Sequence, residues 1–335
     1  MMLLAGDVGA TKTRLGIFSQ EKGPRLPLAE AIFMSREYPD METLVGEFLA
    51  QTGLTIGRGC FGVAGPVIGG TAKFLNLPWV ADERQLCAAL GFSSVILLND
   101  LAAAAHAIPL LGPAELHTIN QGQPVQGGSM AVIAPGTGLG EAFITWDGSR
   151  YRGHASEGGH ADFAPNDRLE IELLLDLQAQ FGHVSYENVC SGRGLPNIYR
   201  FLKKRRFAEE PSWLTEKLAE TDDPVPVIVE AALDQGRPSN LCVEALNIFV
   251  SVLGAEAGNM ALKALATGGV FLAGGIPPRI LPFLNNERFM KAFRYKGRRS
   301  DLVARIPVYV VLNSGVALLG AACYGLASYG EGEVT

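Results

Sequence analysis

Two stretches of this 335-residue chain share one pattern: an apolar strand, a turn rich in glycine and threonine, and a second apolar strand. The first stretch covers residues 3–18 and the second residues 130–146. Strand and helix patterns alternate after the first copy, which is typical of an α/β domain with a mixed sheet. Because the chain is longer than one hydrophobic core supports, and because each copy opens a new run of elements, we expect two domains.

The first turn has the composition of a phosphate-binding loop. Gly6 and Gly9 allow a ligand close to the backbone or a positive φ, and Thr11 adds a hydroxyl donor. Asp7 can hold a hydrated Mg²⁺ beside phosphate oxygens. The Walker A spacing is nearly met, but Thr11 stands where its second glycine belongs, and residues 14–18 alternate like a strand instead of opening a helix. Taken alone, the segment is better explained as a plain hairpin, since these residue types favour turns for steric reasons.

The overall composition excludes several classes of protein. A net charge of −6 and a pI near 5.5 leave no basic excess for nucleic-acid binding. The most apolar stretch, residues 306–327, is interrupted by Pro307 and again at residues 313–315, so we expect no membrane span. The five cysteines are scattered without a C-x-x-C motif, as in reduced intracellular proteins. We therefore expect a cytoplasmic protein.

Periodicity predicts the elements around the two hairpins. In the first part, strands are expected at residues 3–6, 14–18, 28–34, 59–63, 72–75 and 95–98, and helices at 41–51, 82–90 and 101–110. After a turn-rich loop at 120–128, strands are expected at 130–134, 141–146, 270–273 and 308–312, and helices at 167–181, 195–204, 213–220, 241–265 and 316–326. The basic run 291–299 is interpreted as a solvated face.

Polar residues follow the strand at 95–98, at the end where ligands bind in open α/β sheets. Asp100 has two interpretations: a helix N-cap, which this segment alone favours, and a general base that accepts a hydroxyl proton while Asn99 orients the same substrate. Glu157 and His160 flank two glycines and offer hydrogen-bonding groups suited to a polyol. Together with His154 they are also a weak candidate for a zinc site.

Two other segments carry little information by themselves. Glu187 precedes a predicted helix start at Ser191 and would ordinarily be a surface carboxylate. Gly274 and Gly275 follow a buried strand, where they permit either the packing of a flat ring on the backbone or a tight turn into a helix.

In combination, eight segments resemble bacterial glucokinases, in the hexokinase branch of the actin-like ATPase superfamily. They are collinear with that family and cover nearly the whole chain. The Cys-rich zinc signature of the related ROK family is absent from this sequence. The matching segments are residues 6–11, 62–67, 75–79, 98–100, 135–140, 156–163, 187–192 and 272–276.

The resemblance implies a fold of two actin-like (ribonuclease H-like) α/β lobes flanking a central cleft. The small lobe would comprise residues 1–110, with a C-terminal helix at about 313–330 packing back on it, and the large lobe residues 111–312. A homodimer is also expected. One departure concerns Ala10, which stands where a glycine is usual, so its backbone must avoid a positive φ or carry strain.

The resemblance also implies an activity, the transfer of phosphate from ATP to D-glucose with Mg²⁺ present, which is a step of glycolysis. Asp100 would be the base toward the 6-hydroxyl, and the sugar would be bound by Asn99, Asp100, Glu157, His160 and Glu187. ATP would be bound by Gly6, Asp7, Val8, Gly9, Ala10, Thr11, Gly136, Thr137, Gly138, Gly274 and Gly275, with Asp7 holding Mg²⁺ through water.

Three other functions compete with this one. A kinase of another hexose or of an amino sugar would use the same frame, because the sequence does not fix the shape of the pocket. A sugar-sensing regulator would bind without turnover and would have no need of Asp100 as a base. A structural actin-like ATPase would have no use for the sugar-binding set.

Overall fold

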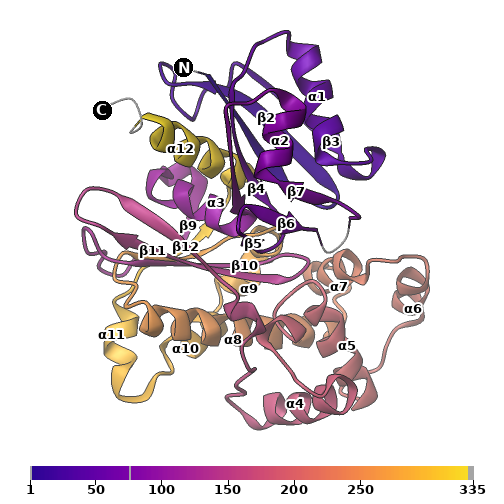
Figure 1. Ribbon diagram of the computed structural model, residues 1–335. Helices are drawn as coiled ribbons and strands as arrows, with labels where there is room; N and C mark the ends of the chain where they lie inside the picture. Colours follow the sequence, from indigo (N-terminus) through magenta and orange to yellow (C-terminus); the bar gives the residue numbers. More distant parts are fainter. Residues whose placement is uncertain (1, 75–76, 331–335) are drawn as a thin grey trace. The chain divides into compact units, whose positions relative to one another are not determined.

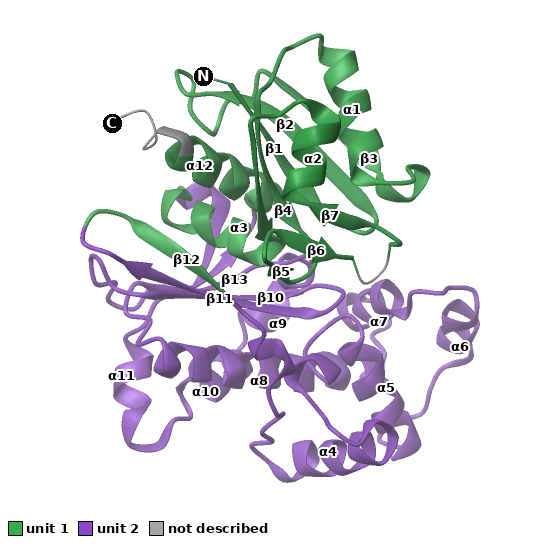
Figure 2. Ribbon diagram, in the orientation of Figure 1, with its two compact units in different colours: residues 1–112, 149–155, 313–335 green, residues 113–148, 156–312 purple. Residues whose placement is uncertain are grey.

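The computed structural model describes residues 2–74 and 77–330 of the chain. They form two compact units, coloured separately in Figure 2: residues 1–112, 149–155 and 313–335 make up unit 1, and residues 113–148 and 156–312 make up unit 2. Residues 149–155, expected in the large lobe, group with unit 1. Leu75, the last residue of one predicted strand, and Asn76, in one matching segment, lie outside the described residues.

Unit 1 is built on a five-stranded sheet with the order β3-β2-β1-β4-β8 (Figure 1). The first hairpin, β1 and β2, is antiparallel, whereas β4 runs parallel to β1 and β8 runs parallel to β4. The strands are β1 (Met2–Val8), β2 (Lys12–Ser19), β3 (Ala29–Met34), β4 (Arg58–Val63) and β8 (Ser94–Asn99). A small separate sheet contains β5 (Val67–Ile68), β6 (Thr71–Lys73) and β7 (Val80–Asp82).

Helices cover both faces of this sheet. Alternate residues of β1 face the helices on one side or the other. Leu4 and Val8 belong to the apolar cluster on the side of α1 (Met41–Thr52) and α2 (Glu83–Leu90). The alternate residues Leu3 and Ala5 belong to the cluster on the other side. That side is covered by α3 (Asp100–Ala107) and by the C-terminal helix α12 (Val316–Gly330), which pack against each other. Asp7 follows the same alternation and therefore faces α3.

Unit 2 repeats this strand arrangement. Its hairpin, β10 and β11, is antiparallel, β13 runs parallel to β10, and β14 runs parallel to β13. A further strand, β9, pairs antiparallel with β14. The strands are β9 (Leu116–Asn120), β10 (Met130–Pro135), β11 (Leu139–Trp146), β13 (Gly269–Leu272) and β14 (Val308–Val311). The strand β12 (Tyr151–Ser156) groups, except for its last residue, with unit 1.

The helices of unit 2 surround α8 (Asn240–Lys263), the buried central helix of the larger core. By length and composition α8 is apolar enough to cross a membrane, but 83% of its most apolar window is buried, as in the core helix of a globular fold. The other helices are α4 (Arg168–Phe181), α5 (Gly194–Lys204), α6 (Ser212–Ala219), α7 (Pro224–Leu233), α9 (Leu281–Leu284), α10 (Glu287–Arg294) and α11 (Ser300–Ala304).

Some elements depart from the sequence-based expectations. The strands β5, β7, β9 and β12 and the helices α7, α9, α10 and α11 were not predicted. The basic run at 291–299 is not simply a solvated face, because α10 begins at Glu287 and buries Phe289, Met290 and Phe293 among its charged residues. The helix expected at 101–110 ends as an α-helix at Ala107 and continues as a 3₁₀ turn.

The contact between α3 and α12 generates a stability prediction. A Cβ on Gly320 would overlap the carbonyl oxygen of Ala103. We expect Gly320→Ala to lower the free energy of unfolding by roughly 1–3 kcal/mol, because the two helices must move apart. In the control Gly46→Ala, on α1, the added Cβ would meet nothing within 4 Å. That variant should gain about 0.5–1 kcal/mol. Urea unfolding measures both, and equal effects would contradict the close packing of α12 on α3.

Candidate functional site

Two carboxylates lie at the carboxyl edge of the unit 1 sheet. Asp7 is the next-to-last residue of β1 and faces α3, and Asp100 is the first residue of α3. Gly62 on β4 makes this approach possible, because a Cβ there would lie 2.8 Å from the Cβ of Ala103 and 3.5 Å from the Cα of Asp100. The register of β1 and β2 places Arg14 directly opposite Asp7.

The charges in this part of unit 1 interact. Burial, and after it the negative charge of Asp100, raise the pKa of Asp7 to about 6 against the opposing effect of Arg14. Asp7 is therefore a carboxylate near neutral pH. Its negative charge is only partly balanced by the positive charge of Arg14. A bound cation would relieve that deficit, so the residues present fit a hydrated Mg²⁺.

The structure separates the two interpretations of Asp100. The N-cap of α3 is Asn99, whose Oδ1 accepts hydrogen bonds from the backbone N–H groups of Leu101 (3.0 Å) and Ala102 (3.2 Å). Asn99 also donates from Nδ2 to the carbonyl oxygen of Gly65 at 3.2 Å. Asp100 is the first helical residue, and its Oδ1 accepts from Leu101 at 2.7 Å. The cap position is thus filled by the neighbouring residue, which removes the main structural explanation for Asp100.

The first Gly/Thr turn is held from outside by one serine. The N–H of Gly9 donates to the carbonyl of Lys12 at 3.0 Å and closes the turn. Ser35, in the 3₁₀ turn Ser35–Glu37, donates its hydroxyl to the carbonyl of Gly9 at 2.7 Å and pairs with the hydroxyl of Thr13 at 2.9 Å. Ala10 has no positive φ, so the alanine fits the turn without strain. The role of Ser35 was missed because it lies beyond the hairpin.

The glycines of this turn serve a different purpose from the one expected. Neither Gly6 nor Gly9 has a φ in the left-handed region. A Cβ on Gly6 would lie 2.6 Å from Phe61, and one on Gly9 would lie 2.9 Å from the carbonyl oxygen of Lys12. These positions require glycine for lack of space.

The second turn, in unit 2, is fixed by Glu187. Within the turn, the N–H of Gly136 donates to the carbonyl of Gly138 at 2.8 Å. Glu187, in the 3₁₀ turn Tyr186–Asn188, accepts from the N–H of Leu139 at 2.9 Å through Oε2. The same carboxylate would overlap a Cβ at Gly138. Glu187 is therefore not an isolated surface residue: its carboxylate lies against the second Gly/Thr turn.

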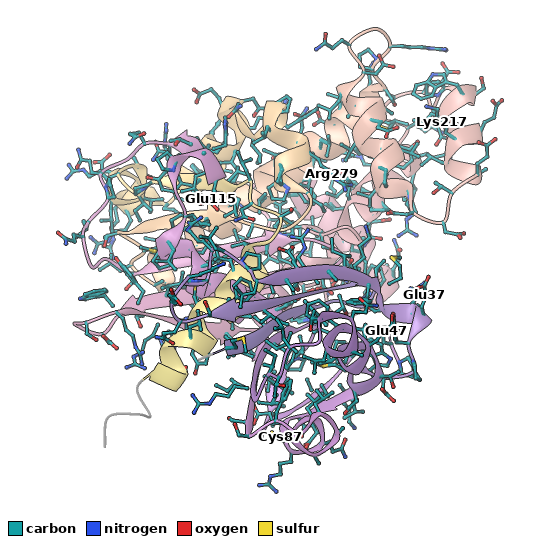
Figure 3. All side chains as sticks on the ribbon, turned by 90° about the horizontal axis from the view of Figure 1, so that it is seen from above. Glu37, Glu47, Cys87, Glu115, Lys217 and Arg279 are labelled. Atoms are coloured by element: carbon teal, nitrogen blue, oxygen red, sulfur yellow. The ribbon has the colours of Figure 1, made fainter. Side chains whose placement is uncertain are left out.

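A cavity of about 540 Å³ in unit 2 adjoins this turn. The β10–β11 turn and the segment after β13 were predicted separately, as a phosphate loop and an adenosine contact, and both contribute to its lining. The starts of α5 and α7 contribute the rest. The lining residues are Gly136, Thr137, Gly192, Arg193, Pro196, Asp222, Asp223, Pro224, Val225, Gly275, Ile276 and Arg279, the last labelled in Figure 3.

The two glycines after β13 differ in what they permit. Gly274 has a φ of +83°, and a Cβ on it would lie 2.6 Å from the carbonyl oxygen of Pro135, so it packs against the second hairpin. A Cβ on Gly275 would meet nothing within 4 Å, which leaves that position open toward the cavity. Gly274 thus sets the backbone path, and Gly275 leaves room for a ligand.

The cavity also contains residues that the sequence motifs did not indicate. Arg193 and Arg279 bring positive charge, and Asp223 is the N-cap of α7, where its Oδ1 accepts from the N–H of Val225 at 3.1 Å. The lining thus has two arginines and two aspartates, Asp222 and Asp223, beside the start of α7. The Asp223-Pro224 pair is a helix-start signal that could have located α7.

Glu157 and His160 lie on one turn of unit 2. Glu157 precedes the 3₁₀ turn Gly158–His160, and the N–H of His160 donates to the carbonyl of Glu157 at 3.0 Å. Both side chains are exposed. Among residues 2–74 and 77–330, no group of three or more His, Cys, Asp or Glu side chains is placed to hold a metal ion, so the weak zinc hypothesis gains no support.

Comparison with known proteins matches the chain over nearly its whole length. The family model for glucokinase matches residues 4–328. The glucokinase of Nostoc punctiforme is 39% identical, over 96% of this chain and 98% of that protein. A solved glucokinase from an Antarctic psychrotroph is 28% identical, with a TM-score of 0.80 over 97% of this chain and 98% of that one. A ROK family glucokinase from Streptomyces griseus, solved with glucose and AMPPNP, is 23% identical, with a TM-score of 0.63 over 97% and 99%. The chain has the actin-like α/β fold of these kinases.

Proposed function

The chain belongs to the glucokinase family, and from that membership we propose that it transfers the γ-phosphoryl group of ATP to the 6-hydroxyl of D-glucose. The products would be glucose 6-phosphate and ADP. The observation that carries the proposal is the cavity in unit 2, because motifs of the kind expected at phosphate (Gly136, Thr137) and at adenosine (Gly275) contribute to one space.

We propose this cavity as the nucleotide site. Its volume lies in the range of small-molecule sites. Gly136, Thr137 and Gly138 would bind phosphate oxygens through the backbone and the threonine hydroxyl, with Arg193 and Arg279 balancing charge. Gly275 would leave space for the adenosine ring. The first turn, from Gly6 to Thr11 in unit 1, is a second proposed phosphate-binding turn.

Asp7 is our proposed contact for Mg²⁺, through water. A bound Mg²⁺ supplies charge neutralisation on the phosphates. Asp7 suits this role because it is half-buried and because burial and the neighbouring Asp100 raise the pKa of Asp7.

Asp100 is our proposed general base. Its carboxylate would accept the proton of the 6-hydroxyl as the phosphoryl group moves to that oxygen. Phosphoryl transfer asks an enzyme mainly for positioning and charge compensation, so the reaction does not require a strong base. Asn99, held by the start of α3 and by Gly65, would orient the same hydroxyl region through its amide. Glu157, His160 and Glu187 would bind the other hydroxyls of the sugar.

A panel assay tests the substrate. Coupled measurement of ADP formation with glucose, mannose, fructose and N-acetylglucosamine should give the highest kcat/KM for glucose. The matching control omits sugar, and ADP release there should be far slower. If an amino sugar or another hexose were preferred, the competing sugar-kinase hypothesis would replace this one. ATP turnover independent of sugar would favour the structural ATPase.

Substitution of the proposed base tests the mechanism. We expect Asp100→Ala to lower kcat by roughly 10²–10⁴, the usual contribution of a positioned acid or base, with a much smaller effect on KM for glucose. The matched control is Asp82→Ala, which removes the N-cap of α2. It should cost about 1 kcal/mol of stability and leave kcat unchanged. Wild-type turnover in Asp100→Ala would reduce Asp100 to a structural residue.

Filling the cavity tests the nucleotide site. Gly275→Leu places a side chain in open space, so the protein should fold while KM for ATP rises roughly tenfold or more, a loss of ~1.4 kcal/mol. KM for glucose should change little. Gly236→Leu, at an exposed glycine elsewhere in unit 2, is the control for added bulk. An unchanged KM for ATP in Gly275→Leu would place the nucleotide elsewhere.

A further inference from the structure

A glutamate lies inside the larger hydrophobic core, close to the proposed sugar-binding turn. Glu141 is on β11 opposite Ile133 of β10, and Ile133 belongs to the core that contains α8. Directly paired residues share a face of the sheet, so Glu141 faces that core. It is 1% exposed. Leu139 and Phe143, two positions away on either side, are apolar residues of the same face.

The carboxyl group of Glu141 is incompletely paired. Its Oε1 atom is buried and has no hydrogen-bond partner among the residues that the structure describes. A buried carboxylate without partners costs much more free energy than a neutral carboxylic acid in the same place. Burial, and after it the negative charge of Glu256, raise the pKa of Glu141 to about 7 against the opposing effect of Lys263.

The surrounding charged groups are provided by four elements. On α8, Glu256 is fully buried and accepts from Asn259 (2.8 Å) and from Lys263 (3.2 Å). Glu256 therefore has two hydrogen-bond donors, whereas Oε1 of Glu141 has none among the described residues. Lys296 donates to Asn259 at 2.7 Å, and burial lowers the pKa of this lysine.

The remaining titratable neighbours are a phenol, a thiol and an imidazole. Burial and Glu256 raise the pKa of Tyr186, whose hydroxyl accepts from Asn259 at 3.0 Å. Burial, Glu256 and Glu141 raise the pKa of Cys190, so its thiol stays neutral. His160 is at the end of the adjoining 3₁₀ turn and is exposed.

This buried network contacts both sugar-binding segments of unit 2. The Oε2 atom of Glu141 lies so close to Gly158 that a Cβ on that glycine would overlap it. Gly158 is the residue between Glu157 and Gly159, so the buried carboxyl supports the turn that displays Glu157 and His160. Tyr186 is adjacent in sequence to Glu187 and anchors that segment to α8.

We propose that Glu141 is a positioning residue: the proton it retains keeps the Glu157–His160 turn in its sugar-binding arrangement, so that sugar affinity falls as Glu141 ionises. This inference rests on the proposed function, because it assumes that Glu157 and His160 bind the sugar. Ionisation of Glu141 would place a negative charge beside Glu256 in the core. The Glu157–His160 turn, which contacts Glu141 at Gly158, would then shift so that water reaches the Glu141 carboxylate.

The decisive variant is Glu141→Gln, which imitates the protonated acid. For the wild-type protein, KM for glucose should rise about tenfold between about pH 6 and pH 8, as expected for one required proton. In Glu141→Gln, KM should stay near the wild-type value at the lower pH across the whole range. The matched control is Glu230→Gln, an exposed glutamate of α7, which should follow the wild type. An unchanged pH profile in Glu141→Gln, or a KM that is flat at the high value, would overturn the proposal.

Thermal unfolding gives a second readout that needs no activity. The folded-state pKa of about 7 lies above that of a solvated glutamate, so the stability associated with the proton is complete at low pH and is lost as pH rises through about 7. Glu141→Gln should therefore melt with the wild type near pH 4 and above it near pH 8, as the unpaired charge is removed. A difference in melting temperature between Glu141→Gln and the wild type that is the same at every pH would also overturn the proposal.

One further variant separates this inference from the proposed function. Glu157→Ala should raise KM for glucose at about pH 6, where Glu141 is protonated. If it does not, the turn is not the sugar site and the residue assignment of the proposed function fails. If Glu157→Ala raises KM but Glu141→Gln retains the wild-type pH profile, the sugar site stands and the role of Glu141 is refuted.

Discussion

The arrangement of both units depends on the parallel pairing of each hairpin's first strand with a later strand, β1 with β4 and β10 with β13. Because parallel strands end at the same edge, the hairpin turn and the neighbouring strand end emerge together. In unit 1 this brings Asp7 to the edge where β8 ends at Asn99. In unit 2 it brings Gly136 to the edge where β13 leads into Gly274. Backbone hydrogen bonds, and not contacts between polar side chains, therefore determine which distant motifs meet.

Glycines then determine how closely other groups approach these edges. Gly62 admits the start of α3, Gly138 admits Glu187, and Gly158 admits Glu141. None of these three has a φ in the left-handed region, whereas Gly274 does. A sequence pattern shows that a glycine is present. It does not show whether the position requires glycine for lack of space or for a positive φ, because that depends on the tertiary neighbours. For Gly6 and Gly9 the structure shows a lack of space where a positive φ or close approach of a ligand was expected.

Features that depend on local sequence could be predicted, whereas features that depend on tertiary contacts could not. The hairpins and most helices were predicted because alternation, helical periodicity and turn residues are local signals. The contribution of Gly136, Thr137 and Gly275 to one cavity agrees with the family resemblance. Arg193, Asp222 and Arg279 could not be assigned to it, because their positions depend on where α5 and α7 begin and on the 3₁₀ turn Pro277–Ile280 after β13. The sequence alone favoured Asp100 as the N-cap of α3, but the cap is Asn99. The two positions differ by one residue, which sequence patterns do not resolve.

Glu141 shows where local rules fail for a physical reason. Read along β11, it is a polar residue in an alternating strand, and only the register with β10 shows that it occupies an inward position between Leu139 and Phe143. An apolar side chain there would avoid both the desolvation cost and the repulsion from Glu256. The core offers Glu256 two hydrogen-bond donors but leaves one oxygen of Glu141 without a partner. Burying Glu141 costs desolvation free energy, so a contribution to stability does not explain the residue. It lies against the turn that carries Glu157, and its ability to gain and lose a proton is the better explanation.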